Sequence, residues 1–125
     1  MDPHRFMRTA NRRVLVADDN LDAAESMRVL LGAMGCEAYV VHDGLAALAL
    51  LRSAPLDLAI LDIAMPGMDG WEVARRITQE SRDPPYLIAL SGFGLSTDRA
   101  HSLRCGFSEH LVKPLRLQDL ERLVG

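Results

Sequence analysis

Short apolar runs alternate five times along this chain with segments of helical periodicity. The runs are RVLVAD (13–18), EAYVVH (37–42), LDLAILD (56–62), YLIALS (86–91) and EHLVK (109–113). In the segments that follow them, apolar residues recur every three or four positions, as in amphipathic helices. Five such repeats with short connections predict an α/β domain, in which a parallel sheet carries helices on both faces.

Local signals predict where the helices begin and end. Asp22, with Glu25 three residues later, predicts the start of the first helix, and Gly35 predicts its end. Asp69 and Ser96 predict the starts of the third and fourth helices. The residues expected to face inward in the first, third and last helices are Ala23, Met27, Leu30, Leu31, Met34, Val73, Ala74, Ile77, Leu117, Leu120 and Val124.

Composition excludes several classes of function. A net charge of −3 offers no basic surface for nucleic acid or an anionic membrane, and no apolar run approaches the roughly 20 residues that span a bilayer. Cys36 and Cys105 lack metal-ligand spacing, so we expect reduced thiols in a cytoplasmic protein. We expect residues 1–10 to be a flexible lead-in and residues 11–125 to form one domain.

Polar residues close all five expected strands, but His42 and Asp43 at the end of the second lie toward an outer position and need no special role. Asp18 and Asp19 end the first strand, Asp62 the third, Ser91 the fourth and Lys113 the fifth. In open parallel sheets, ligands bind outside the carboxyl ends of the strands. The site is therefore expected where these five side chains meet.

These residue types suit a phosphoryl group held beside a divalent cation. Carboxylates crowded together raise one another's pKa unless a cation neutralises them. Mg²⁺ fits because it binds one or two carboxylates, keeps several waters and favours phosphate ligands. Lys113 and Ser91 can bind phosphate oxygens, which leaves an aspartate free to act as a nucleophile.

Four motifs at these strand ends resemble the response-regulator receiver domain of two-component signalling. They are VLVADDN, LAILDIAMPGMDGWEVARRI, LIALSG and GFSEHLVKPL, and the resemblance runs from Arg13 to Val124. It implies a flavodoxin-like fold with strand order 2-1-3-4-5. It also implies that the domain is a signalling switch rather than an enzyme that turns over a substrate. The segment from ALSGFG to LVKPL is more similar to receivers of hybrid histidine kinases than to receivers joined to DNA-binding domains. The possibility that the protein is a freestanding regulator stays open.

The resemblance also implies roles for the acids. Asp62 would accept a phosphoryl group from a phosphohistidine on a histidine kinase or a histidine phosphotransfer protein. Asp19, Asp62 and the backbone carbonyl of Ala64 would ligate Mg²⁺, and Asp18 would act through a bound water.

The remaining roles concern the switch. Ser91 and Lys113 would bind the phosphoryl group, with a cis peptide bond from Lys113 to Pro114. His110 stands where the family usually has a switching tyrosine or phenylalanine; an ordinary half-exposed strand residue is the alternative. The surface that responds is expected over the helix from Ser96, the strand 109–113 and the last helix, where a kinase, a phosphotransfer protein or a second receiver would bind.

Two departures from the family bear on the lifetime of the phosphoryl group. Ala64 replaces a polar side chain that can orient the attacking water, and Phe93 is large enough to cover the acyl phosphate. We therefore expect slow dephosphorylation. Trp71 is expected to pack in the core.

Alternative interpretations remain at this point. A solvated acidic loop would leave Asp62, Ser91 and Lys113 unexplained. An aspartyl-nucleophile phosphatase would place an acid two residues after its nucleophile, where this chain has Ala64. A flavodoxin would need a Ser/Thr-rich phosphate loop after the first strand. A pseudo-receiver, which binds partners without phosphorylation, is the strongest alternative.

Overall fold

A computed structural model describes residues 11–92, 94 and 96–125 of the chain. The predicted lead-in, residues 1–10, and Phe93 lie outside the described residues. The elements are β1 (Arg13–Ala17), α2 (Leu21–Ala33), β2 (Glu37–Val41), α3 (Gly44–Ser53), β3 (Leu58–Asp62), α4 (Gly70–Glu80), β4 (Tyr86–Ser91), α5 (Ser96–Cys105), β5 (Glu109–Val112) and α6 (Leu117–Val124).

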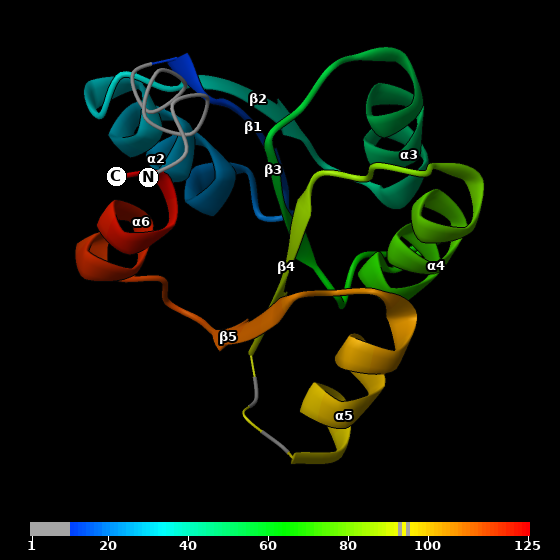
Figure 1. The fold of residues 1–125 in the computed structure, drawn as a ribbon. Helices are drawn as coiled ribbons and strands as arrows, with labels where there is room; N and C mark the ends of the chain where they lie inside the picture. The colour runs from blue at the N-terminus through cyan, green and yellow to red at the C-terminus, as the bar shows by residue number, and fades with distance from the viewer. Residues whose placement is uncertain (1–10, 93, 95) are drawn as a thin grey trace, which may run out of the picture.

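The five strands form one parallel sheet in the order β2-β1-β3-β4-β5, as predicted. Helices α2 and α6 cover one face, and α3, α4 and α5 cover the other (Figure 1). Because parallel strands end at the same edge of a sheet, the carboxyl ends of β1, β3, β4 and β5 lie together. None of the described helices is both long and apolar enough to cross a membrane.

The alternation of side chains along each central strand builds two cores. Val14 and Val16 of β1 pack against α2 and α6, while Leu15 and Ala17 pack against the helices of the other face. All five residues of β3 are buried. Burial of a Leu or Ile side chain contributes roughly 1.5–3 kcal/mol to the stability of the fold. The buried central strands therefore hold the residues at their carboxyl ends in fixed positions.

Three predictions about the helices need correction. Asn20 caps α2, with its side chain accepting a hydrogen bond from the Ala23 N–H, whereas Glu25 lies in the second turn and pairs with Arg28. The buried stripe of α2 is Ala24, Met27 and Leu31. Ala23 and Leu30 are exposed because they lie beside that stripe.

In α6 the inward residues are Leu120, Leu123 and Val124, which recur at helical spacing, whereas Leu117 in the first turn is exposed. The third helix expected from the sequence is α4, and it matches its prediction: Asp69 is the N-cap, and Val73, Ala74 and Ile77 are buried.

Candidate phosphoryl and metal site

Asp18 and Asp19 emerge from the end of β1 in different environments. Asp18 is 1% exposed, and its Oδ1 accepts a hydrogen bond of 3.0 Å from the Asn20 N–H. Asp19 is exposed to solvent. The Asn20 cap of α2 thus also fixes the Asp18 carboxylate, and the two adjacent acids face the site from different depths.

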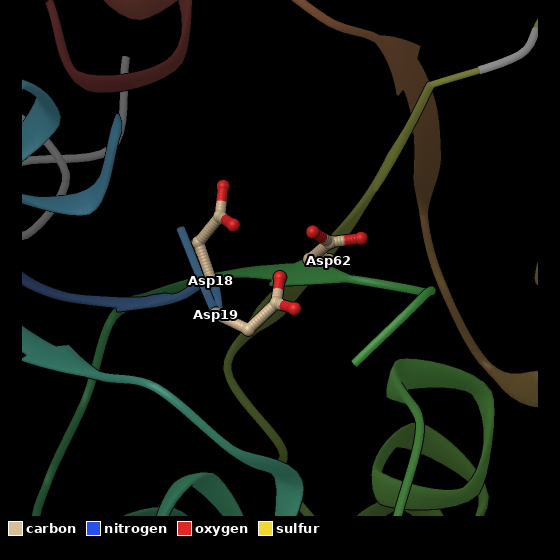
Figure 2. Close-up of side chains that lie close together, drawn as sticks. All are labelled: Asp18, Asp19 and Asp62. Atoms are coloured by element: carbon tan, nitrogen blue, oxygen red, sulfur yellow. The ribbon is translucent and has the colours of Figure 1, made fainter. Parts of the chain in front are cut away.

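Asp62 closes the neighbouring strand β3 and is 2% exposed. Its Oδ1 accepts a hydrogen bond of 2.9 Å from the Ala64 N–H, which fixes the orientation of the carboxylate. Each of Asp18, Asp19 and Asp62 offers a carboxylate oxygen within 4.8 Å of the others. Figure 2 shows Asp18 and Asp19, which follow β1, and Asp62 at the end of β3 gathered at the same sheet edge.

Lys113 brings a cation to these acids directly after β5. Its ammonium lies 2.5 Å from Asp62 Oδ2 and 3.3 Å from Asp18 Oδ2. The Lys113 N–H donates a hydrogen bond of 2.7 Å to the Ser91 carbonyl, and the peptide bond to Pro114 is cis, as expected. Strands β4 and β5 therefore hold Lys113 over the aspartates.

The electrostatics of the site are those of crowded acids with too little positive charge. Burial raises the pKa of Asp18, and the charge of Asp62 raises it further, although the Asn20 N–H and Lys113 act in the opposite direction. Burial lowers the pKa of Lys113, but its hydrogen bond to Asp62 and the charges of Asp62 and Asp18 outweigh burial and leave that pKa raised. A divalent cation would relieve this imbalance.

Ser91 is the last residue of β4 and is 2% exposed. The strand register pairs Asp62 with Leu90, and Ser91 with Val112, which precedes Lys113. Ser91 thus lies between the strand ends that carry Asp62 and Lys113, as the sequence predicted.

The loop after Asp62 packs tightly against the site. Gly67 has a φ of 74°, which an L side chain rarely adopts. Asp69 caps α4 by accepting a hydrogen bond of 2.9 Å from the Glu72 N–H. A Cβ on Gly70 would lie 2.5 Å from the Asp62 carbonyl oxygen, so the first turn of α4 rests directly on the backbone of Asp62.

His110 is 5% exposed rather than half-exposed, and a polar contact missed by sequence reasoning lies beside it. Ser102 Oγ lies 2.7 Å from His110 Nδ1 and accepts a hydrogen bond of 2.9 Å from Trp71 Nε1. These residues come from three elements, and no spacing signal joins them. Sequence reasoning offered no role for His42, whose Nδ1 lies 3.1 Å from the Asp18 carbonyl oxygen.

The fold and the acids at its strand ends define the class of protein. Residues 14–125 match the family model of the response regulator receiver domain, and the chain belongs to this family. Receiver domains are the signalling switches of two-component systems and bind Mg²⁺ at an acidic pocket. They interact with histidine kinases and phosphotransfer proteins.

Two curated bacterial relatives are a transcriptional regulatory protein and a sensor histidine kinase. The chain is 39% identical to the transcriptional regulatory protein TctD of Salmonella typhimurium over 87% of the chain and 48% of TctD. It is 30% identical to the sensor histidine kinase GacS of Pseudomonas protegens over 98% of the chain and 14% of GacS. The chain thus spans about half of one relative's length and a small part of the other's.

A similar solved structure is the receiver domain of the sensor histidine kinase PA1611 from Pseudomonas aeruginosa. It shares 25% identity and a TM-score of 0.81 over 92% of this chain and 95% of that chain. That structure has a magnesium ion coordinated in its active site cleft.

Proposed function

We propose that this domain accepts a phosphoryl group on Asp62, from a phosphohistidine of a histidine kinase or a histidine phosphotransfer protein. The observation that carries the proposal is the surroundings of Asp62. Its buried carboxylate lies 2.5 Å from the Lys113 ammonium, in a cluster of three acids. Phosphoryl transfer needs positioning and charge neutralisation more than covalent assistance, and these residues supply both.

The donor set fits Mg²⁺. Hard carboxylate oxygens and a backbone carbonyl are the protein ligands that this ion favours, and it keeps open positions for water and a phosphoryl oxygen. We assign Asp19, Asp62 and the Ala64 carbonyl as direct ligands and Asp18 as a ligand through water. Bound there, Mg²⁺ would neutralise the acids and the charge of the transferred group.

In the transfer step, a carboxylate oxygen of Asp62 forms a bond to phosphorus while the bond from phosphorus to the donor imidazole nitrogen breaks. The bonding electron pair leaves with the imidazole, and the product is an acyl phosphate. Lys113 lies at Asp62 Oδ2 and is placed to pair with the phosphoryl oxygens once the bond has formed. The Ser91 hydroxyl donates to the same group.

The phosphorylated state biases a two-state equilibrium, which is how a receiver passes its signal on. Ser91 and His110 are the proposed switch residues. The responding surface lies over α5, β5 and α6, and it binds a kinase, a phosphotransfer protein or a second receiver. We place this domain in the cytoplasm.

Beryllofluoride, which mimics a phosphoryl group on an aspartate, tests this proposal. Trp71 is the single tryptophan of the chain and follows Gly70, which rests on the Asp62 backbone. Beryllofluoride with Mg²⁺ is expected to change Trp71 emission, and to leave it unchanged when Mg²⁺ is omitted or in Asp62→Ala. An unchanged emission in the wild-type protein would instead indicate a pseudo-receiver.

A further inference from the structure

A single buried hydroxyl joins two rings from different elements of the domain. Ser102 of α5 is 0% exposed, accepts a hydrogen bond of 2.9 Å from the Trp71 indole of α4, and lies 2.7 Å from Nδ1 of His110 on β5. The indole can only donate and the hydroxyl can both accept and donate, so Ser102 connects the two rings in either tautomer of His110. We call these three residues the Trp71–Ser102–His110 bridge.

The bridge matters because α5 has little apolar packing of its own. Ser102 and Cys105 are its buried residues, although residue 95 before the helix lies outside the described residues. A second polar contact joins α5 to β5, a hydrogen bond of 3.0 Å from Arg99 to the His110 carbonyl oxygen. Hydrogen bonds to β5 therefore contribute to holding α5 in position.

The other end of the bridge lies at the phosphoacceptor. Trp71 directly follows Gly70, and a Cβ on Gly70 would lie 2.5 Å from the Asp62 carbonyl oxygen. A displacement of the Asp62 backbone therefore has to move the first turn of α4, which carries the indole. The indole is in turn hydrogen-bonded to the hydroxyl that contacts His110.

We propose that Ser102 is a positioning residue that couples the Asp62 site to the surface of α5 and β5, through the Trp71 indole and the His110 imidazole. The inference rests on the proposed function and adds a route for its signal. It predicts that loss of the Ser102 hydroxyl leaves the chemistry at Asp62 intact and weakens the response of β5.

Nuclear magnetic resonance tests the coupling because the chain has one indole signal. In the wild-type protein, Mg²⁺ and beryllofluoride are expected to shift the Trp71 indole signal and the amide signals of residues 109–112. In Ser102→Ala the shifts of residues 109–112 fall to less than half. Ser102→Thr, which restores the hydroxyl, recovers them, and Ser108→Ala, at an exposed position of the following loop, leaves them unchanged.

Phosphoryl uptake from phosphoramidate, measured in parallel by intact mass, separates the two proposals. Absence of uptake in the wild-type protein contradicts the proposed function. Equal uptake in wild type and Ser102→Ala, with equal shifts of residues 109–112, overturns the coupling role and leaves the proposed function standing. Reduced shifts that Ser102→Thr does not recover also overturn it. If Ser102→Ala does not fold, Trp71→Phe removes the same N–H donor and keeps an aromatic ring, and unreduced shifts there contradict the proposal.

Discussion

Lys113 Nζ donates a hydrogen bond of 2.5 Å to Asp62 Oδ2 across 51 residues of sequence. The same ammonium lies 3.3 Å from Asp18 Oδ2, so one cation serves two buried carboxylates. Lys113 is the single lysine of the chain. This relationship makes the metal-free site short of positive charge, and its consequences for stability are measurable.

Replacement of Asp18 by asparagine is expected to stabilise the metal-free protein. Burial raises the pKa of Asp18, so the folded state holds this proton more tightly than the unfolded state does. Its contribution to stability is therefore present below the ordinary pKa of 3.8 and is lost as pH rises through the higher folded-state value. Asp18→Asn removes that loss and should raise the free energy of unfolding by about 1 kcal/mol at pH 7 in EDTA.

Thermal unfolding of wild type and Asp18→Asn, with EDTA or Mg²⁺, checks this expectation. The variant should unfold at the higher temperature in EDTA, and the difference should shrink as pH is lowered toward 3.8. Mg²⁺ should stabilise the wild type more than the variant. A variant that is less stable in EDTA at pH 7 would contradict the electrostatic account.

Removal of the Lys113 ammonium should have the opposite effect. Lys113→Met leaves Asp62 and Asp18 buried without their cation and should lower the free energy of unfolding by about 2 kcal/mol at pH 7. The pKa of Lys113 is raised above 10.5, so its contribution is present below pH 10.5 and is lost as pH rises through the folded-state value. The free energy of unfolding of the wild-type protein should thus fall as pH rises above 10.5. The part of this fall that comes from deprotonation of Lys113 should be absent in Lys113→Met.

Denaturant unfolding between pH 6 and 11 provides the measurement. Reductive methylation with labelled formaldehyde also gives one side-chain signal for the single lysine, whose titration reports the pKa of the dimethylated Lys113 amine directly. A Lys113 signal that titrates at or below the ordinary value for this amine would argue against the ion pairs described here.

The contact between Gly70 and Asp62 predicts a large effect of a single methyl group. In Gly70→Ala the new Cβ would lie 2.5 Å from the Asp62 carbonyl oxygen. Neither atom can move away by a side-chain rotation, because the oxygen belongs to the backbone and the Cβ is bonded directly to it. The free energy of unfolding should fall by about 3 kcal/mol. Gly32→Ala is the matched control, because a Cβ there meets nothing within 4 Å inside α2 and should add about 1 kcal/mol. Equal stabilities of the two variants would contradict the close packing.

Ala64 predicts a long-lived acyl phosphate. This residue is exposed, its N–H donates to Asp62 Oδ1, and its methyl group cannot orient a water. Ala64→Asn introduces a carboxamide and should shorten the half-life several-fold. Loss of radiolabel from the phosphorylated protein measures it, with Ala64→Ser as a smaller polar control. A half-life unchanged by asparagine would contradict this explanation.

The fold could be predicted from the sequence because each of its signals is local or periodic. Apolar runs such as LDLAILD predict buried strands, and Asp69 and Gly35 mark helix ends at single positions. The site residues at the strand ends followed from the topology, which brings Asp62 and Lys113 together whatever the side chains between them.

What the sequence could not predict depends on small rotations and on pairs of distant residues. Met27 and Leu31 of the predicted stripe of α2 are buried, whereas Ala24 is buried in place of Ala23. The Trp71–Ser102–His110 bridge joins residues 31 and 8 positions apart, and a buried serine has no sequence signature of its own.

The proposed role of this domain depends on covalent transfer of a phosphoryl group to Asp62. The most direct measurement incubates the protein with phosphoramidate and Mg²⁺, followed by intact mass and peptide mapping, with Asp62→Ala as the blank. We predict one phosphoryl group per chain on the peptide that contains Asp62. It should form when Mg²⁺ is present and should not form when EDTA replaces Mg²⁺. An unmodified wild-type chain, or equal modification of Asp62→Ala, would contradict the account.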